Sequence, residues 1–400
     1  MSKNTAYANY KTGFTKQGKD TLSRTINLDA ASFSGRIDKI LKIICEKIQL
    51  SQTQHIQAEE HYMAVSRWLE QEDSILSAYK PKIYPQGSLP MGVTNKPLKR
   101  EEYDLDFICE LQLYSWQVTP ADLFSKVEYR ISQHKDYRNR MELGKRCIKL
   151  TYAHDFHLDI VPACTNGAAG YGQVQIPDRE LESWRDTNSK QYVEWFNAIA
   201  DQSQEAGRID AAEPLSPPEA FEEKSALKFA VQLMKRYRDI AFQEKSDLAP
   251  VSIVLSTLSA QGYSGSESVF ETVKRTLETI QALIESSPGR LQVWNPANCV
   301  LEDLGERWDS NPDAYAEFKS WISEFGGIWQ QLEQTRGTEE ISRILISLFG
   351  EYPTQEAIRE DARRTDDARQ AKHLGVTAGT ATLTIQSPAI IVPKNTFYGQ

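Results

Sequence analysis

In residues 103–109 every second side chain is apolar, and the intervening positions include Asp104 and Asp106. This period of two constrains the fold more than any other feature of the chain, because it is the period of a β-strand. One face of the strand would pack into a core. The other would carry two carboxylates about 6.5 Å apart along the chain.

A pair of strands is predicted at residues 146–152 and 156–161, joined by a tight turn into a hairpin. In the second strand the apolar residues alternate and would face a core. Asp159 would then point to the opposite face. Asp159 is therefore the candidate for a third carboxylate beside Asp104 and Asp106.

Three carboxylates at one rigid point suit the transfer of a nucleotidyl group. This chemistry needs charge neutralisation and positioning, and hard cations such as Mg²⁺ prefer carboxylate oxygens. We therefore expect Mg²⁺, with Mn²⁺ as a substitute, because carboxylates held together without a cation raise one another's pKa. An Asp-x-Asp pair alone is weak evidence, since such pairs also occur on solvated strand faces. The combination with Asp159 carries the prediction.

The dipeptide Gly87-Ser88 precedes the Asp104 strand. Glycine lets a phosphate approach the backbone closely, and serine adds a hydroxyl and an N–H donor. A Gly-Ser pair is by itself an ordinary turn. Its place between the extended run at residues 82–84 and the Asp104 strand favours a phosphate-binding loop.

Lys228 and Lys235 are seven residues apart on an expected helix and would share a face, and Ser252 follows after a turn. These lysines could hold a triphosphate or its leaving pyrophosphate as point charges. The alternative is a solvated basic face, an interpretation that Arg236 and Arg238 fit better.

The rest of the chain is predominantly helical. Helices are expected at residues 37–48, 55–79, 119–135, 221–242, 250–262, 266–286, 311–325 and 338–349. The Pro-rich stretch 213–218 marks a boundary. We divide the chain into a partly mobile N-terminal segment (1–34), a nucleotidyltransferase core (35–212), a helical domain (213–352), and a charged helix with a flexible C-terminal tail (353–400).

Charge and cysteine content narrow the class of protein. The net charge of −9 argues against stable binding of duplex DNA. The five cysteines form no zinc or redox motif, and we interpret them as reduced. The polar N-terminus has no signal-peptide pattern, and no run of about 18 apolar residues predicts a membrane span. We therefore expect a cytoplasmic protein.

Taken in order, these motifs resemble the bacterial cGAS/DncV-like nucleotidyltransferases, the synthases of the antiphage signalling systems called CBASS. The resemblance covers roughly residues 35–350. It rests on Gly87-Ser88, Asp104-x-Asp106, the strand at 156–162, Ile176-Pro177-Asp178, Trp184, Tyr192-x-x-Trp195-Phe196, residues 230–239 and 252–260, Trp294-Asn295-Pro296 and Arg307-Trp308.

This resemblance implies an α+β fold: a polymerase-β-like core, with a mixed sheet and flanking helices, joined to a helical domain across an active-site cleft. It implies an enzyme that condenses nucleoside triphosphates, ATP among them, into a cyclic di- or trinucleotide second messenger in antiviral defence. Ancillary proteins of such a system are candidate partners.

The resemblance also implies roles for individual residues. Three would bind the metal ions and carry the chemistry: Asp104, Asp106 and Asp159. Six would bind the nucleotide: Gln86, Gly87, Ser88, Lys228, Lys235 and Ser252. Of the two lysines, Lys235 is the preferred phosphate ligand.

Two other functions stay open at this point. One is an RNA-tailing enzyme of the same fold, such as a poly(A) or CCA-adding polymerase, although such an enzyme needs a broad basic surface and this chain is acidic. The other is a catalytically inactive nucleotide-binding module, against which the presence of all three carboxylates argues.

Overall fold

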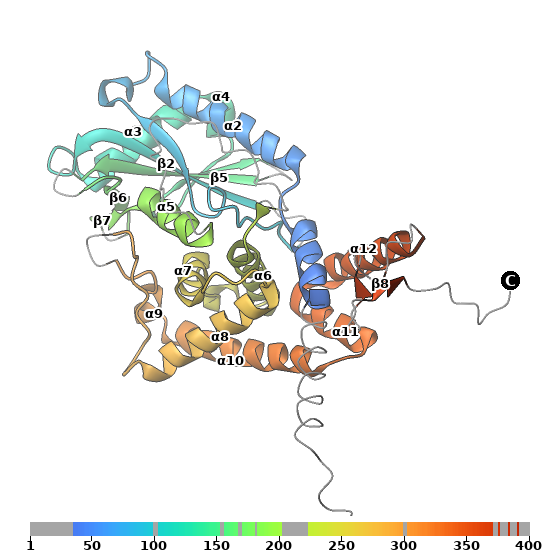
Figure 1. The fold of residues 1–400 in the computed structure, drawn as a ribbon. Coiled ribbons are helices and arrows are strands. Elements are labelled where there is room, and N and C mark those ends of the chain that lie inside the picture. Colours follow the sequence, from blue (N-terminus) through green and yellow to red (C-terminus); the bar gives the residue numbers. More distant parts are fainter. Residues whose placement is uncertain are drawn as a thin grey trace, which may run out of the picture.

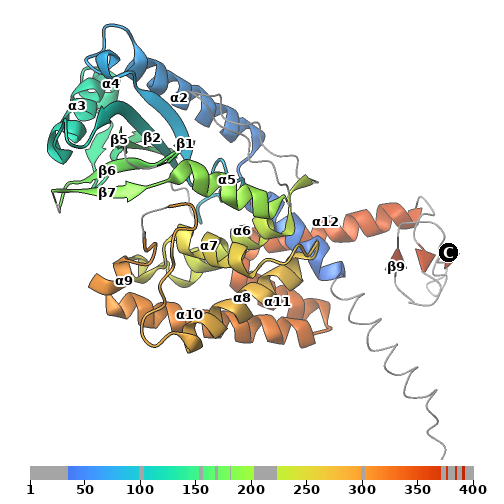
Figure 2. The same ribbon diagram turned by 60° about the vertical axis from the view of Figure 1, so that its left-hand side comes forward.

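A computed structural model describes residues 35–98, 103–152, 156–166, 170–180, 182–201, 223–298 and 302–370, with three short strands near the C-terminus. The expected mobile segment 1–34, the Pro-rich boundary 213–218 and most of the tail beyond residue 370 lie outside the described residues. The structure has two parts (Figures 1 and 2). We call residues 49–201 the sheet lobe, and residues 35–48 with 223–370 the helical lobe.

The sheet lobe is built on seven strands in the order β1-β2-β5-β4-β3, with β6 paired to β5 and β7 to β6. β2 and β5 run parallel and the other neighbours antiparallel, so the sheet is mixed, as expected. The strands are β1 (Lys82–Gln86), β2 (Tyr103–Tyr114), β3 (Met141–Leu143), β4 (Ile148–Tyr152), β5 (Phe156–Thr165), β6 (Val174–Asp178) and β7 (Ser183–Thr187).

Three helices cover one face of this sheet: α2 (Gln52–Glu70), α3 (Pro120–Ser132) and α4 (Lys135–Arg138) (Figure 1). Their apolar residues pack against the alternate residues of β2 and β5 that face inward, among them Leu105 and Leu158. The opposite face carries the acidic residues. The period of two therefore predicted which side of each strand is buried.

The helical lobe consists of helices that surround the buried α6. It contains a helix over residues 35–48, α6 (Ala226–Ala241), α7 (Ser252–Gly262), α8 (Val269–Ser286), α9 (Arg307–Ser310), α10 (Pro312–Gln334), α11 (Thr338–Phe349) and α12 (Glu351–Gln370). Two short 3-10 helices, η1 (Ser77–Tyr79) and η3 (Ser246–Leu248), lie in connections. Beyond α12, β10 (Ile390–Ile391), β8 (Gly375–Val376) and β9 (Leu383–Thr384) pair in that order.

The helix over residues 35–48 packs with the helical lobe rather than with the sheet. Ile37, Leu41 and Ile44 are fully buried in one cluster with residues of α6, α8 and α10. A division of the chain at residue 213 alone therefore does not describe the packing, because the first helix closes the core of the second lobe.

Several helix ends differ from the expected ones. α2 ends at Glu70, nine residues early, because the chain turns before η1. α10 runs nine residues beyond the expected end, to Gln334. Gly326 and Gly327 do not break it, because Trp329 continues its buried face and donates from Nε1 to the carbonyl of Phe270 at 3.2 Å.

α5 (Ser189–Ala200) lies between the two lobes in both views (Figures 1 and 2). Its residues Tyr192 and Phe196 pack with Leu227 and Val231 of α6 in a small apolar cluster. The Tyr192 hydroxyl also lies 2.8 Å from that of Thr257 in α7. α5, the last helix of the sheet lobe, therefore joins it to the helical lobe by a packed contact.

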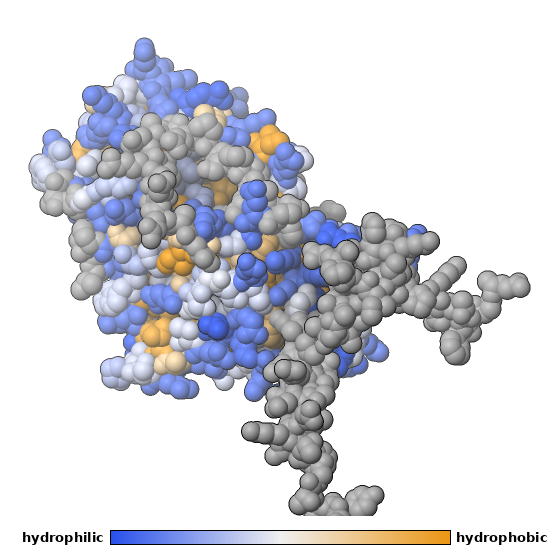
Figure 3. All heavy atoms as spheres, in the orientation of Figure 1, coloured by the Kyte–Doolittle hydropathy of each residue, from blue (hydrophilic) through white to orange (hydrophobic). Residues whose placement is uncertain are grey.

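The surface in Figure 3 is largely hydrophilic, with small and separate hydrophobic patches. Among the described residues, none of the helices has both the length and the apolar character needed to cross a membrane.

Asp38 provides a test of the place of the first helix. Its Oδ1 accepts hydrogen bonds from the backbone N–H of Phe270 at 2.8 Å and the hydroxyl of Ser268 at 3.1 Å, at the start of α8. Asp38→Ala removes this cap and should cost about 1–2 kcal/mol, which lowers Tm by a few degrees. Glu339→Gln removes an exposed ion pair and should leave Tm unchanged. If Asp38→Ala and Glu339→Gln had the same Tm, this would contradict the contact of the first helix with the start of α8.

Candidate active site

The parallel pairing of β2 and β5 places the expected carboxylates side by side. Asp106 lies opposite Asp159 in the register, and Asp104 lies two residues before Asp106 on the same face of β2. Neighbouring strands are about 4.8 Å apart, so the backbone fixes this proximity without any side-chain interaction. The structure thus brings together the three residues that the sequence predicted.

Gly87 closes the site on the side of β1. Gln86, the last residue of β1, pairs with Asp106 in the antiparallel register. Gly87 follows with a φ of +70°, and a Cβ built on it would lie 2.9 Å from Asp106 Oδ2. Only glycine fits this left-handed position against the carboxylate. Ser88 follows, with its hydroxyl 3.0 Å from that of Thr94.

The carboxylates destabilise one another's charged forms, and burial adds to the effect. Burial, followed by the charges of Asp159 and Asp104, raises the pKa of Asp106 to about 7. Burial also raises the pKa of Asp159, and Lys149 opposes the shift. From the sequence, like charges were expected to raise the pKa values of these aspartates, but their removal from water is the larger cause of the shifts.

Lys149, in β4, and Cys147, the residue before β4, lie beside the carboxylates. Lys149 pairs with Asp159 in the register of β4 and β5. Its Nζ lies 3.9 Å from Asp104 Oδ1 and 3.8 Å from Asp159 Oδ1. The Sγ of Cys147 lies 3.5 Å from Asp159 Oδ2. Neither residue was among the predicted site residues, although the alternation of residues 148–152 would put Lys149 on the face of Asp159.

The residues fit a bound cation. Asp159 Oδ1 is buried and accepts no hydrogen bond, although buried carboxylate oxygens are normally satisfied. Among the described residues, no three His, Cys, Asp or Glu side chains are close enough to form a ready-made metal site. A hard divalent ion would satisfy the oxygen and draw the three together.

The helical lobe supplies basic groups that face the carboxylates. Lys235 is buried, and its Nζ donates to the carbonyl of Val93 at 3.0 Å. Burial, then the charge of Arg238, lowers the pKa of Lys235 to about 8. The hydroxyl of Ser252, at the start of α7, accepts from Arg238 Nη1 at 2.6 Å.

An open cleft of about 870 Å³ lies between the lobes, and Lys235, Arg238 and Ser252 are among the residues that line it. This volume is within the usual range for a site that holds a small molecule. Its walls include all but two of the predicted site residues: Gln86, Gly87, Ser88, Asp104, Asp106, Lys235 and Ser252. Asp159 lies next to Asp106 without lining the cleft itself.

The other exception is Lys228, which is buried and paired with Asp201 at 3.0 Å.

The alternative of a solvated basic face on α6 is wrong, because Lys228, Lys235 and Arg236 are all buried. Arg236 donates to the carbonyl of Phe349 at 3.1 Å, and Arg238 lines the cleft. Charge alone in the sequence could not separate structural from cleft-lining residues on this helix.

Comparisons with known proteins agree with this geometry. Residues 36–199 match the family model of the Second Messenger Oligonucleotide or Dinucleotide Synthetase domain. A c-di-GMP synthase of Roseivirga ehrenbergii is 31% identical over 375 residues, which cover 91% of this chain and 97% of that protein. The cyclic dinucleotide synthase CdnG of Bradyrhizobium diazoefficiens is 25% identical over 388 residues, which cover 90% and 91%.

Solved structures share the fold. The Bradyrhizobium diazoefficiens CdnG in complex with GTP superposes with a TM-score of 0.67 at 23% identity, over 81% of this chain and 98% of that chain. The Vibrio cholerae DncV cyclic AMP-GMP synthase in complex with nonhydrolyzable GTP gives a TM-score of 0.52 at 15% identity, over 84% and 90%. Because the Roseivirga ehrenbergii relative is 31% identical over 91% of this chain, the chain belongs to the cGAS/DncV-like nucleotidyltransferases, the family that its motifs predicted.

Proposed function

We propose that the protein condenses nucleoside triphosphates, with GTP among its substrates, into a cyclic dinucleotide. The register that pairs Asp106 with Asp159 across parallel strands carries the proposal, because it builds a carboxylate cluster facing a basic wall across a cleft. The preference for guanine is supported by the relative named a c-di-GMP synthase and by the relative solved with GTP. The expectation that ATP is also used stays open to the product analysis below.

The two walls of the cleft would divide the work. Gln86, Gly87 and Ser88 would hold the donor triphosphate through the loop that follows β1. Lys235 and Ser252 would contact its phosphates from the helical lobe. The phosphate charge would in turn favour the protonated form of Lys235, whose pKa burial has lowered.

The reaction is an in-line displacement at the α-phosphorus. The hydroxyl of the acceptor nucleotide would lose its proton, for which Asp159 is the candidate acceptor, and its oxygen would form a bond to phosphorus. The bond to the β-phosphate would break and pyrophosphate would leave. A second displacement of the same kind would close the ring. A triphosphate held by both walls is positioned for this step, and positioning supplies much of the catalysis.

Asp104, Asp106 and Asp159 would bind Mg²⁺, with Mn²⁺ as a substitute. A divalent ion bound there would neutralise phosphate charge and acidify the attacking hydroxyl. The buried oxygen of Asp159 that accepts no hydrogen bond supports this assignment.

The cellular role follows from the family. We propose that the product is a second messenger of a CBASS antiphage system in the cytoplasm, with ancillary proteins of that system as partners. An RNA-tailing reaction is the competing proposal. The named activities of the two relatives and the net charge of −9 support a reaction without RNA.

Incubation of the purified protein with all four nucleoside triphosphates and Mg²⁺ tests the product. We expect a guanine-containing cyclic dinucleotide that resists phosphatase, identified by its mass. A product that appears only when RNA is added would favour the tailing reaction instead.

Asp104→Asn and Asp106→Asn should each lower product formation at least a hundredfold, because they remove ligands of the charge-neutralising ion. Circular dichroism should show that both variants fold. Lys228→Met, outside the cleft, is the comparison: its removal costs stability but should leave kcat within about threefold. A loss of kcat in Lys228→Met as large as in the aspartate variants would contradict a purely structural role of Lys228.

Stability without metal gives a test that is independent of activity. Asp106 has an ordinary pKa of 3.8 when unfolded and about 7 when folded, so its charge destabilises the fold increasingly as the pH rises from 4 to 7. In EDTA, Asp106→Asn should therefore raise Tm, and by more at pH 8 than at pH 5. Mg²⁺ should raise Tm of the wild type and not of the variant.

Asp367→Asn is the matched control, since Asp367 is exposed on α12. Its Tm should follow the wild type at both pH values, with and without Mg²⁺. A lower Tm of Asp106→Asn in EDTA at pH 8 would mean that the Asp106 carboxylate stabilises the fold, contrary to the metal-ligand role.

A further inference from the structure

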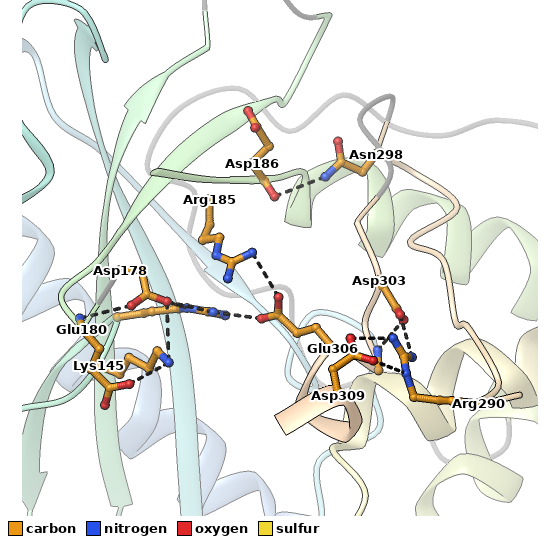
Figure 4. Close-up of polar contacts among 12 residues, drawn as sticks. Lys145, Asp178, Glu180, Arg185, Asp186, Arg290, Asn298, Asp303, Glu306 and Asp309 are labelled. Atoms are coloured by element: carbon orange, nitrogen blue, oxygen red, sulfur yellow. Dashed lines mark hydrogen bonds and ion pairs between the residues drawn. The ribbon is translucent and has the colours of Figure 1, made fainter. Parts of the chain in front are cut away.

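A polar seam joins the lobes beside the cleft, next to the apolar contact of α5, against which Ala297 and Leu304 of the loop before α9 pack. Figure 4 shows it between the strands of the sheet lobe and the loop that leads into α9. From the helical lobe, Glu306 lies between two arginines of the sheet lobe. Its Oε1 accepts from Arg146 Nη2 at 2.9 Å, and its Oε2 lies 3.2 Å from Arg185 Nη1.

Arg146 is held in place before it meets Glu306. Asp178, at the end of β6, is fully buried, and its Oδ2 accepts from Arg146 Nε at 2.9 Å. Lys145 Nζ lies 3.8 Å from the same oxygen, and the Glu180 N–H donates to Asp178 Oδ1 at 3.2 Å. A buried carboxylate requires such partners. It therefore fixes the guanidinium at the surface of the sheet lobe.

Glu306 is likewise held on its own side. Arg290 pairs with Asp303 and with Asp309, each at 2.7 Å, and these two residues flank Glu306 in the chain (Figure 4). The backbone N–H of Gly305 donates to Asp303 Oδ1 at 2.8 Å. Both ends of the contact are thus ordered in advance, which reduces the entropic cost that makes most exposed ion pairs weak.

A second contact ties the same loop to the rim of the cleft. Asn298 Nδ2 lies 3.3 Å from the carbonyl of Asp186 (Figure 4). It also lies 2.8 Å from Glu302 Oε2, which accepts from Asn295 Nδ2 at 2.8 Å. Asn295 lines the cleft, as does Thr187, the neighbour of Asp186. The seam therefore borders the space between the lobes.

The seam also reaches the carboxylates through the chain. Arg146 directly precedes Cys147, whose sulfur contacts Asp159, and lies three residues before Lys149. Glu306 therefore contacts the sheet lobe close to the carboxylates, so this contact sets the position of the helical lobe relative to the wall that carries them.

We propose that Glu306, gripped by Arg146 and Arg185, is a positioning residue that holds the helical lobe at the angle at which Lys235 and Ser252 face Asp104 and Asp106. This role of Glu306 rests on the proposed function in one respect, namely that the cleft binds a nucleoside triphosphate. Such a ligand must contact both lobes at once, so only protein molecules whose lobes are at the correct angle bind it tightly. When fewer protein molecules have this angle, the apparent affinity for the ligand falls in proportion.

The test measures binding and turnover in Glu306→Gln, Arg185→Met and the double variant. Titration calorimetry with a nonhydrolysable GTP analogue and Mg²⁺ should show each single variant binding about tenfold more weakly, and KM for GTP should rise by a similar factor. At saturating GTP the ligand itself restores the angle, so kcat should stay within about twofold. Tm should change by no more than about 2 °C, because the pairs are half-exposed.

The double variant should bind no more weakly than the weaker single variant, because both residues act through one contact. Glu333→Gln is the matched control. It removes the half-exposed pair of Glu333 with Lys274 inside the helical lobe and should leave KM unchanged.

Unchanged affinity and KM in Glu306→Gln and Arg185→Met would overturn the proposal. So would losses that multiply in the double variant, or a fall of kcat at unchanged KM. A wild type that binds the analogue but forms no product would instead refute the proposed function, and the binding data would still decide the role of Glu306.

Discussion

The site depends on the parallel pairing of β2 with β5 inside an otherwise antiparallel sheet. That register places Asp106 beside Asp159 and, through the period of two, Asp104 on the same face. Backbone hydrogen bonds hold the carboxylates close together in a buried place. Burial, followed by the charges of Asp159 and Asp104, raises the pKa of Asp106, so the charged cluster costs free energy. Helices on the opposite face stabilise the sheet and so offset that cost. Strain of this kind is expected where a protein prepares a site for a cation.

The opposing charges come from a different kind of structure. On the helical lobe, α6 is buried on almost every side, and it presents Lys235 and Arg238 to the cleft while its other basic residues form internal contacts. Lys149 provides a cation within the sheet itself. It lies between two carboxylates, where it opposes the rise in the pKa of Asp159. The cleft thus has Asp104 and Asp106 on one wall and, on the other, Lys235 with Arg238, which is paired with Asp239. Carboxylates suit a metal ion and basic groups suit a triphosphate.

Local patterns explain which features could be predicted from the sequence. Alternation along β2 and β5 identified the three aspartates, since the period of two is set by each strand alone. Gly87 was predicted to let a phosphate approach the backbone, and this role stays a prediction. The structure shows a different need for glycine there, a positive φ with the Asp106 carboxylate 2.9 Å from where a Cβ would lie. The basic residues of α6 were harder to interpret. Whether Lys228 reaches the cleft or pairs with Asp201 depends on the rotation of the helix against the other lobe, which helical spacing does not encode.

The relation between the lobes was invisible in the sequence for the same reason. The seam is built from four separate segments, which contribute Arg146, Asp178, Arg185 and Glu306. Asp178 lies in the motif Ile176-Pro177-Asp178, but that motif does not indicate which residues Asp178 contacts. Each residue is an ordinary charged side chain until the fold buries Asp178 and orders the two arginines. The carboxylates are fixed by hydrogen bonds within one sheet, whereas their distance from Lys235 depends on contacts between lobes. Nucleotidyl transfer needs both, so a seam of oriented ion pairs beside the cleft can control the reaction without touching the substrate.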